Sequence, residues 1–361
     1  DNNLQDNPNL SCAGRLPSGC AQHAVRAARG SALYGNRLLM QVVTLAGGVG
    51  ASKLLWGLQR VLDPRALTIV VNTGDDLELY GLSISPDLDI VTYTLADVVN
   101  TSTGWGVQGD TRALLDALRR FGKETWFCLG DRDLATHIYR TECLRAGSPL
   151  TAVTDSIRRA FGVTARIIPM SDQPIRTMIK TDRGMMHFQE YLVKNSAEPV
   201  VRGIAFEGLE QSSPAPGALE AIARADRILI CPSNPLISIG PILAVPGIRD
   251  ALRACRERVI AVSPIVAGKS LKGPSDRMLA QLGHEVSATG VARLQRDIVG
   301  TFVIDREDSA QRGAIEGLGL RVFVTDTVMG KDNEKIRLAH ELVALMEKQM
   351  ASSVAGVPTA P

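Results

Sequence analysis

Aromatic residues make up only 4% of the 361-residue chain. Basic segments interleaved with aromatics, which single-strand nucleic-acid binders use, are missing. No apolar run approaches the roughly 18 residues that a membrane-spanning helix needs. Basic and acidic residues are nearly balanced, since the chain has 40 of the former and 38 of the latter, and the net charge is only +2. These absences argue against nucleic acid and membrane as partners, and we expect a soluble protein that acts on a small molecule.

Cysteine is scarce and scattered, with six residues at positions 12, 20, 128, 143, 231 and 255. They form no C-x-x-C pair, so a structural zinc site is not expected. A chain of this length does not need disulfides, and the reducing cytoplasm is the simplest location. Cys128 and Cys231 follow predicted strands, where a buried thiol is a more common role than a nucleophile.

Residues 1–39 differ from the rest, because they are rich in Asn, Ser, Gly, Ala and Arg and contain no lysine. We interpret them as a disordered or non-native extension, with the folded part starting at Met40. From there, short apolar strands alternate with amphipathic helices. We predict strands at 40–46, 67–72, 227–231, 258–262, 300–304 and 320–324, and helices at 51–62, 246–254 and 309–317. This alternation predicts an α/β fold, a Rossmann-like doubly wound, mostly parallel sheet.

The rhythm breaks between 163 and 212, where extended segments surround the turn Asp182-Arg183-Gly184. The segments 167–168, 177–180 and 185–193 suggest β structure. We therefore divide the chain into a core of 40–144 and 213–348, a smaller inserted α+β subdomain at 145–212, and a flexible tail at 349–361. A helix at 332–348 closes the core, and another starts near Asp110 and Thr111 with an apolar face of Leu114, Leu115, Leu118 and Phe121.

The first strand is followed by a glycine-rich turn that leads into a helix. Gly47, Gly48 and Gly50 allow a tight turn and a close approach of backbone N–H groups to a ligand. A helix N-terminus favours phosphate, and Lys53 adds a positive charge. The spacing matches neither a P-loop nor a dinucleotide fingerprint. The turn therefore predicts phosphate binding, the alternative being a tight turn without a ligand.

Ligands of parallel α/β sheets bind at the carboxyl ends of the strands. Asn72-Thr73-Gly74-Asp75-Asp76 follows the second strand. Asp75 and Asp76 suit a magnesium ion that bridges to a substrate phosphate, although a solvated turn explains them too.

Three further loops offer polar groups. Ser233, Asn234 and Ser238 lie in a proline-containing loop after strand 227–231, suited to a nucleotide base or phosphate. The loop 263–274 contains Ser263, Gly268, Lys269 and Lys272, which suit a diphosphate or a plain surface turn. The segment Leu129–Ile138 contains three charged residues at 131–133 and a histidine at 137. The structural interpretation is that the charged residues form ion pairs that fix a helix start and that the histidine packs. The alternative is that the block is functional.

Together these blocks resemble one family. The motifs are Gly-Gly-Val-Gly-Ala-Ser-Lys (47–53), Asn-Thr-Gly-Asp-Asp (72–76), Ser-Pro-Asp-Leu-Asp (85–89), Leu-Gly-Asp-Arg-Asp-Leu-Ala-Thr-His (129–137), Met-His-Phe-Gln (186–189), Pro-Ser-Asn-Pro-x-x-Ser-Ile-Gly-Pro (232–241) and Ser-Pro-Ile-Val-x-Gly (263–268). In this order they closely resemble the 2-phospho-L-lactate transferase family of coenzyme F-420 biosynthesis. The resemblance covers about residues 40–345.

The resemblance implies an activity. A phospho-acid (2-phospholactate, phosphoenolpyruvate or phosphoglycerate) would move from its GDP-type diphosphate ester to the ribityl hydroxyl of the deazaflavin Fo. GMP would leave, and F-420-0 or an analogue would form. The family requires Mg²⁺ and is usually homodimeric. We also expect the unstable donor to come from the guanylyltransferase of the same pathway.

The resemblance also implies residue roles. Asp76 matches the metal-binding aspartate, with Asp75 as second ligand or proton acceptor, and these two are the predicted catalytic pair. Asp89 matches a contact to Fo, and Cys128 matches another, made through its backbone. The full predicted substrate-binding set is Gly47, Gly48, Gly50, Lys53, Asn72, Asp89, Cys128, Asp131, Arg132, Ser233, Asn234, Pro235, Ser238, Gly240, Ser263, Gly268 and Lys269. The acceptor of the proton from the attacking ribityl hydroxyl stays open among Asp75, Asp89 and solvent.

Two alternatives stay open. A related superfamily of sugar-nucleotide-binding regulators shares the glycine turn but lacks blocks 129–137 and 186–189. A nucleotide-dependent dehydrogenase is disfavoured because Lys53 breaks the fingerprint. The motifs do not specify which three-carbon acid is carried, because pocket shape decides that.

Overall fold

The computed structural model describes residues 40–355, which lie in one compact unit that begins at Met40. The extension predicted at 1–39 lies outside the described residues, as does the end of the predicted tail at 356–361. Within the described part of the chain, none of the helices combines the length and apolar composition needed to cross a membrane.

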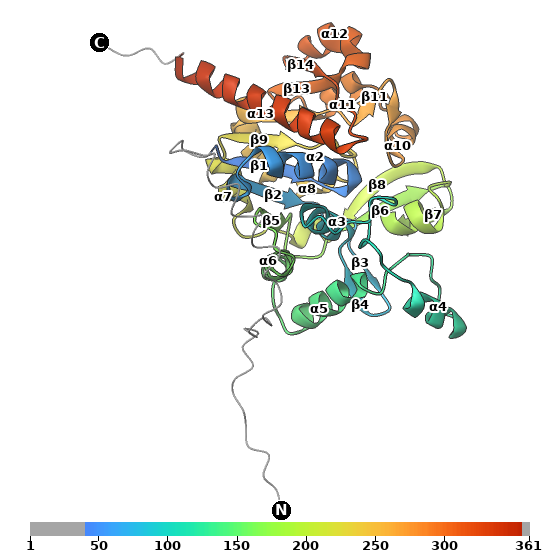
Figure 1. Cartoon of the computed structure of the whole chain (residues 1–361). Helices are drawn as coiled ribbons and strands as arrows, with labels where there is room; N and C mark the ends of the chain where they lie inside the picture. Colours follow the sequence, from blue (N-terminus) through green and yellow to red (C-terminus); the bar gives the residue numbers. More distant parts are fainter. Residues whose placement is uncertain (1–39, 356–361) are drawn as a thin grey trace, which may run out of the picture. The chain divides into compact units, whose positions relative to one another are not determined.

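Seven parallel strands form the main sheet, in the order β14-β13-β10-β9-β1-β2-β5 (Figure 1). Buried, branched apolar residues dominate them, as expected of a sheet covered on both faces. The strands are β1 (Val42–Ala46), β2 (Leu67–Val71), β5 (Arg166–Pro169), β9 (Arg227–Ile230), β10 (Val259–Val262), β13 (Thr301–Asp305) and β14 (Arg321–Thr325). All six strands predicted from the sequence are present, and the prediction of a doubly wound parallel sheet is confirmed.

Two separate apolar cores flank the sheet, because successive residues of a strand face opposite sides. Val43 and Leu45 of β1 belong to one core, whereas Val42 and Ala46 belong to the other. The first core includes residues of α7 (Ala218–Arg224), α8 (Ile239–Ala244), α9 (Ile248–Ala254), α11 (Ala288–Gln295) and α12 (Arg312–Glu316). The second includes residues of α2 (Gly48–Val61), α3 (Pro86–Leu95), α6 (Leu150–Ala160) and α13 (Asp332–Ala355).

A smaller antiparallel sheet, β7-β6-β8, lies where we predicted inserted β structure. Its strands are β6 (Arg176–Thr181), β7 (Gly184–His187) and β8 (Val201–Glu207). The predicted boundary at 145 is wrong, because β5 pairs with β2 and α6 packs on β5 in the main core. Residues predicted as extended up to 193 form a helical turn at Glu190–Lys194, and residues 349–355 of the predicted tail continue α13.

A second excursion from the sheet, at 77–145, was not predicted as a unit. It contains the hairpin β3 (Leu77–Leu79) and β4 (Leu82–Ile84), then α3, α4 (Ala113–Arg120) and α5 (Asp133–Arg145). Of the apolar face predicted for α4, Leu115 is buried but Phe121 is 80% exposed, so this part of the prediction is wrong. The remaining helices are α10 (Ser275–Gln281) and the short η1 (Pro64–Ala66), η3 (Leu209–Gln211), η4 (Arg256–Arg258) and η5 (Arg306–Gln311), with the small hairpin β11 (Ile265–Val266) and β12 (Lys269–Ser270).

Candidate functional site

One cavity of about 580 Å³ opens beyond the carboxyl ends of β1, β2, β9 and β10. This is the position at which open parallel sheets bind their ligands, and the volume suits a molecule of nucleotide size. The lining includes the glycine turn, the start of α3, the start of α5 and the loops after β9 and β10. The loops predicted to carry the chemistry therefore meet at one place.

The glycine turn is shorter than predicted, because α2 already begins at Gly48. Gly48 has a φ of +72°, a conformation that glycine adopts without a steric penalty. The Ser233 hydroxyl donates a 2.8 Å hydrogen bond to the Gly47 carbonyl and ties the turn to the loop after β9. The N–H of Gly48 donates to Asp87 Oδ1 at 2.8 Å. A carboxylate thus caps the start of α2 from inside the cavity.

Asn72 holds two buried carboxylates beside this turn. Its side-chain N–H₂ donates to Asp87 Oδ2 at 2.9 Å and to Asp75 Oδ1 at 3.2 Å. Gln189 donates to the other oxygen of Asp75 at 3.4 Å. Both carboxylates line the cavity and are about 5% exposed or less. Asn72 itself is fully buried behind them, so it shapes the site from the second layer rather than from the cavity wall.

These two carboxylates are held in an environment that disfavours their charge. Burial raises the pKa of Asp87 to about 6, and burial together with the charge of Asp87 raises that of Asp75 well above its usual range. Among residues 40–355, no lysine or arginine pairs with either group. Carboxylate oxygens are the ligands that a hard divalent cation prefers. Asp75 and Asp87 therefore fit the predicted Mg²⁺.

Asp76 is oriented differently from its neighbour. It does not line the main cavity but a second one of about 290 Å³, where the Ser85 hydroxyl donates to Asp76 Oδ2 at 2.7 Å. Asp75 lies in a turn that is closed by the Asp76 N–H donating to the Thr73 carbonyl, and β3 begins directly after Asp76, so the two side chains leave the backbone in different directions. The structure thus pairs Asp75 with Asp87, and we replace Asp76 by Asp87 in the predicted metal site.

Lysines form the positive side of the cavity. Lys53 lines it and donates to the Met329 carbonyl at 3.0 Å. Burial and the nearby charges of Lys272 and Lys335 lower the pKa of Lys53. Lys272 lines the cavity too, whereas the predicted Lys269 is exposed in β12 and does not. Repelling cations held close together favour an anionic ligand between them.

Most other predicted residues reach the cavity. Ser233, Asn234, Ser238, Ser263, Asp89 and Cys128 line it, with the glycines 47, 48 and 50. Asp131, Arg132, Pro235, Gly240, Gly268 and Lys269 are not among its lining residues. Asp131 instead accepts hydrogen bonds from the N–H groups of Ala113 and Leu114 and caps α4. Asp110 accepts from the N–H groups of Arg132 and Asp133 and fixes the start of α5, which supports the structural interpretation of that block.

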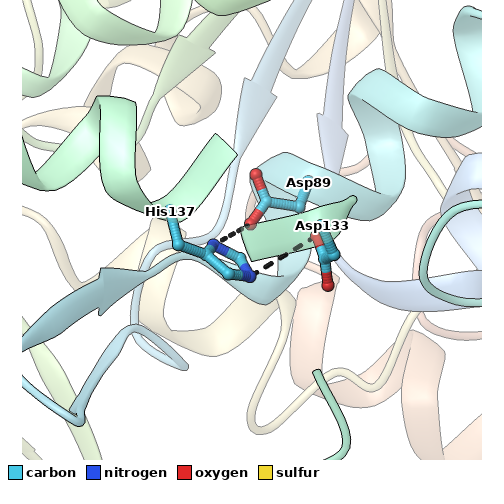
Figure 2. A group of neighbouring side chains, drawn as sticks. All are labelled: Asp89, Asp133 and His137. Carbon is cyan, nitrogen blue, oxygen red and sulfur yellow. Dashed lines mark ion pairs between the residues drawn. The ribbon is translucent and has the colours of Figure 1, made fainter. Parts of the chain in front are cut away.

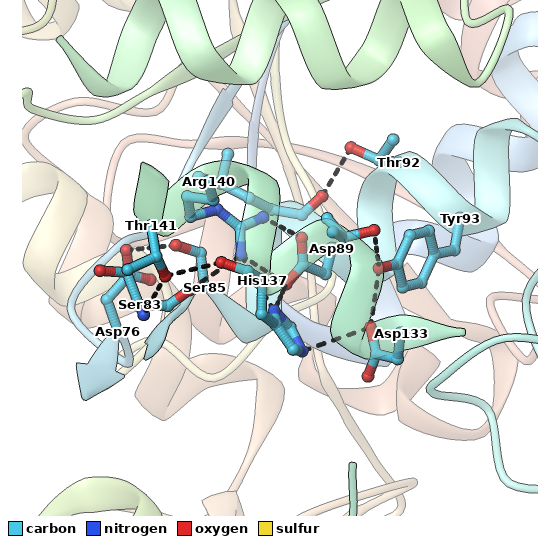
Figure 3. Close-up of polar contacts among 12 residues, drawn as sticks. Asp76, Ser83, Ser85, Asp89, Thr92, Tyr93, Asp133, His137, Arg140 and Thr141 are labelled. Carbon is cyan, nitrogen blue, oxygen red and sulfur yellow. Dashed lines mark hydrogen bonds and ion pairs between the residues drawn. The ribbon is translucent and has the colours of Figure 1, made fainter. Parts of the chain in front are cut away.

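A histidine lies between two carboxylates in the same cavity wall (Figure 2). His137 Nδ1 is 3.6 Å from Asp89 Oδ2, and Nε2 is 3.4 Å from Asp133 Oδ1. Arg140 forms a two-pronged ion pair with Asp89, and the Tyr93 hydroxyl donates to Asp133 at 2.7 Å (Figure 3). We predicted that this histidine simply packs. It also lines the cavity between two carboxylates, where it can contact a ligand.

The raised pKa values make stability depend on pH. Between pH 3.8 and about 6, Asp87 keeps its proton in the folded protein but loses it in the unfolded chain. The contribution of Asp87 to the free energy of unfolding is therefore fully present below pH 3.8 and is lost as the pH rises to about 6. The change is about 3 kcal/mol. We expect urea unfolding to show that Mg²⁺ stabilises the protein much more at pH 8 than at pH 5. Equal stabilisation at both pH values would contradict this.

The fold is that of an α/β protein with a partly polar cavity at the carboxyl ends of its parallel strands. The chain belongs to the 2-phospho-L-lactate transferase CofD family, whose sequence profile matches residues 42–329. It is 41% identical over 306 residues to a 2-phospho-L-lactate transferase from Methanosarcina acetivorans, an alignment that covers 85% of this chain and 99% of the relative. It is 39% identical over 318 residues to a phosphoenolpyruvate transferase from Streptomyces griseus, covering 86% and 100%.

Among solved structures, the chain is similar to a UPF0052 family protein from Bacillus halodurans, with a TM-score of 0.58 and 16% sequence identity. The match covers 85% of this chain and 100% of that structure, and it supports the fold alone. The predicted family and fold class are thus confirmed, and the protein is a member of a transferase family.

Several cavity residues were not selected from the sequence. Asp87 and Gln189 lie within the quoted blocks 85–89 and 186–189, so the motifs carried a signal for them. Asp133 and His137 are spaced four residues apart, which places them on one face of a helix. Trp105 also lines the cavity, and no motif pointed to it.

Proposed function

We propose that this protein transfers a phospho-acid from its guanylylated diphosphate ester to the ribityl hydroxyl of Fo, with release of GMP. The observation that carries the proposal is the identity of 41% to a relative named 2-phospho-L-lactate transferase that is matched over 99% of its length. The Streptomyces relative named phosphoenolpyruvate transferase makes enolpyruvate an equally eligible acid. The product is F-420-0 or its dehydro or glyceryl analogue.

The cavity supports this chemistry through charge. Attack of an alcohol on a diphosphate requires neutralised phosphate charge and in-line positioning. Lys53 and Lys272 bind and orient the diphosphate, and the backbone of the glycine turn approaches it. Mg²⁺, when bound by Asp75 and Asp87, supplies further charge neutralisation at the phosphates. Ser233, Asn234 and Ser238 hold the guanosine end, and the acceptor lies towards Asp89 and Cys128.

The assembly around this reaction is part of the same proposal. We place the enzyme in the cytoplasm as a homodimer that receives its unstable donor from the guanylyltransferase of the pathway. The alternative, a sugar-nucleotide-binding regulator, is disfavoured because His137 and Gln189, from blocks that such regulators lack, both line the cavity.

A direct assay tests the proposal. Purified protein is incubated with Fo, Mg²⁺ and an equimolar mixture of the three guanylylated donors, and products are identified by mass. We expect GMP together with one dominant phosphodiester of Fo, whose mass names the acid. Binding of the donors without any new Fo ester would favour the regulator instead.

The lysine placement gives a separate prediction. Lys272→Ala should raise the KM for the donor by about tenfold, because one charge contact to a diphosphate is lost, while kcat falls less. Lys269→Ala, three residues away but outside the cavity lining, is the matched control and should leave both constants unchanged. Equal effects of the two substitutions in steady-state kinetics would argue that the whole loop, rather than Lys272, contacts the donor.

A further inference from the structure

Trp105 is a large aromatic side chain in the cavity wall to which the proposed function assigns no role. It lines the cavity and is 42% exposed, although tryptophan rings are mostly buried in folded proteins. Leu271 and Val193, which are also exposed, line the same cavity from two other segments of the chain. Exposed apolar side chains that gather at one cavity indicate a surface that a ligand covers.

The three tryptophans of the chain differ in what their rings contact. The guanidinium of Arg60 lies over the ring of Trp56, 3.4 Å from its centroid. Trp126 packs edge-on against Phe127, with the ring centroids 5.6 Å apart. Among residues 40–355, the ring of Trp105 meets neither another aromatic ring nor a cation. The ring of Trp105 therefore stays available to a ligand in the cavity.

The loop that carries Trp105 is held in shape by its own backbone. Gly104 and Gly106, on either side of Trp105, have φ values of +81° and +73°, which other residues rarely adopt. The N–H of Asn100 donates to the Gly106 carbonyl at 2.9 Å, and the N–H of Gly104 donates to the Asn100 carbonyl at 2.8 Å. A tryptophan on such a loop loses little conformational freedom when a ligand stacks on it, so little binding free energy is lost to ordering.

The two ends of this loop are tied to the helices on the acceptor side of the cavity. The N–H of Val99 donates to the Tyr93 carbonyl at 3.1 Å, and Tyr93 lies on α3, the helix that carries Asp89. At the other end, Arg132 Nη1 donates to the Gln108 carbonyl at 3.3 Å, directly before α5 begins. Trp105 therefore belongs to the part of the wall towards which the acceptor lies.

The same loop also touches the side chains that contact the diphosphate. A Cβ built on Gly104 would lie 3.0 Å from Lys272 Nζ and 3.3 Å from a methyl carbon of Val49, at the start of α2. The residues assigned to the guanosine belong to the loop after β9 instead. Trp105 is thus placed next to the diphosphate contact, as expected of a residue that holds the acceptor near the phosphorus that it attacks.

We propose that Trp105 is a specificity-determining residue for the acceptor and that its indole ring stacks on the planar tricyclic ring of Fo, an inference that rests on the proposed function. Aromatic rings stack favourably when they are offset, and tryptophan has the largest ring of all side chains. The stack holds the ring of Fo, so that the ribityl chain reaches the phosphates beside Lys272. An acceptor without an aromatic ring loses this contact.

The test compares the affinity for Fo with that for GDP. Trp105→Leu keeps an apolar side chain but removes the ring. With Mg²⁺ and GDP present, we expect its Kd for Fo, measured by calorimetry, to rise by about tenfold or more, and the KM for Fo to rise with it. The value of kcat should fall less than about threefold, because the stack is made equally in the bound substrate and in the transition state. The Kd for GDP should also change less than about threefold.

A spectroscopic signature separates stacking from a general structural role. Stacked chromophores absorb less strongly, so the absorption band of Fo should lose intensity on binding to wild type. Trp105→Phe retains a ring and should keep this loss of intensity and recover most of the affinity, whereas Trp105→Leu should show neither. Phe121→Leu, a change at an 80% exposed position outside the cavity lining, is the matched control and should behave as wild type.

The outcomes distinguish the inference from the proposed function. If Trp105→Leu weakens GDP binding as much as or more than Fo binding, the ring serves the guanine or the loop as a whole, and the inference is overturned. Unchanged binding of both ligands overturns it as well. In either case the proposed function stands as long as wild type forms the Fo ester. A wild type that neither binds Fo nor forms the ester overturns the proposed function itself.

Fluorine NMR of wild type labelled with 5-fluorotryptophan covers the case in which substitutions at Trp105 do not fold. The resonances of the three tryptophans are assigned with Trp56→Phe and Trp126→Phe. We expect Fo to shift the Trp105 resonance through its ring current, GDP to shift it less, and the Trp56 resonance to stay in place. A Trp105 resonance that does not move when Fo binds would contradict the proposal.

Discussion

Replacing Asp87 by asparagine should lower kcat by about 100-fold or more while the protein stays folded. A bound divalent cation supplies several kcal/mol of charge stabilisation to a transferring phosphoryl group, and Asp87 is one of the two carboxylates that fit it. Steady-state kinetics at several Mg²⁺ concentrations measure the effect. The loss should be only partly recovered at high Mg²⁺, because Asp75 remains as a ligand. Glu220→Gln, an exposed change on α7, is the charge-matched control and should have no effect.

The same variant should change how stability depends on pH. The difference in unfolding free energy between Asp87→Asn and wild type should rise by up to about 3 kcal/mol from pH 4 to pH 8, measured without metal. Wild type loses stability as the buried Asp87 becomes charged. Asparagine cannot become charged, so the stability of the variant does not fall over the same pH range. A difference that does not vary with pH, or wild-type turnover in the variant, would remove Asp87 from the account. Asp76→Asn, outside this cavity, should affect turnover less.

Gly50→Ala should disrupt the junction between the glycine turn and the loop after β9. A Cβ built on Gly50 would lie 2.4 Å from the Pro232 carbonyl oxygen, and backbone on both sides leaves little room to move. Overpacking of this kind costs about 1–3 kcal/mol. Because the junction positions Ser233 against Gly47, donor affinity should fall by tenfold or more. Urea unfolding and calorimetric titration with GDP measure the two effects.

Gly313→Ala is a matched control for that substitution. Gly313 lies in α12, and apart from its chain neighbours and the helix's own backbone no atom lies within 4 Å of the added Cβ, so alanine should be neutral or stabilise the helix by about 0.5–1 kcal/mol. Donor affinity should not change. If Gly50→Ala binds GDP as tightly as this control, the close approach of the two loops is not needed for ligand binding.

The main sheet could be predicted because its strands are continuous apolar runs followed by loops with turn residues. β5 was assigned to the wrong unit because Arg166–Pro169 offers only two isoleucines and follows a break in the rhythm. Its place next to β2 depends on pairing between residues about 100 positions apart, which no local pattern encodes. Phe121 shows the same limit, since a helical apolar period does not reveal whether a partner surface exists.

The position of the cavity at the carboxyl ends of the strands was predicted correctly, but not all of the side chains that line it were. Adjacent carboxylates at 75 and 76 looked like a pair, yet their side chains face different cavities. The partner of Asp75 is Asp87, brought close by the fold of 77–95 and by hydrogen bonds to Asn72 and Gly48. Likewise, Lys272 lines the cavity, whereas Lys269 is exposed in β12 and does not. Such choices depend on side-chain direction, which spacing alone does not determine.

The central claim is that a divalent cation joins the donor diphosphate to Asp75 and Asp87 beside the glycine turn. Crystals grown with GDP and Mn²⁺ test it directly, because anomalous scattering locates the cation without assumptions about its ligands. The account predicts a peak in contact with both carboxylates and a phosphate oxygen, close to Lys53 and Lys272. A peak among Asp89, Asp133 and His137, or GDP bound with no cation near Asp75 and Asp87, would contradict it.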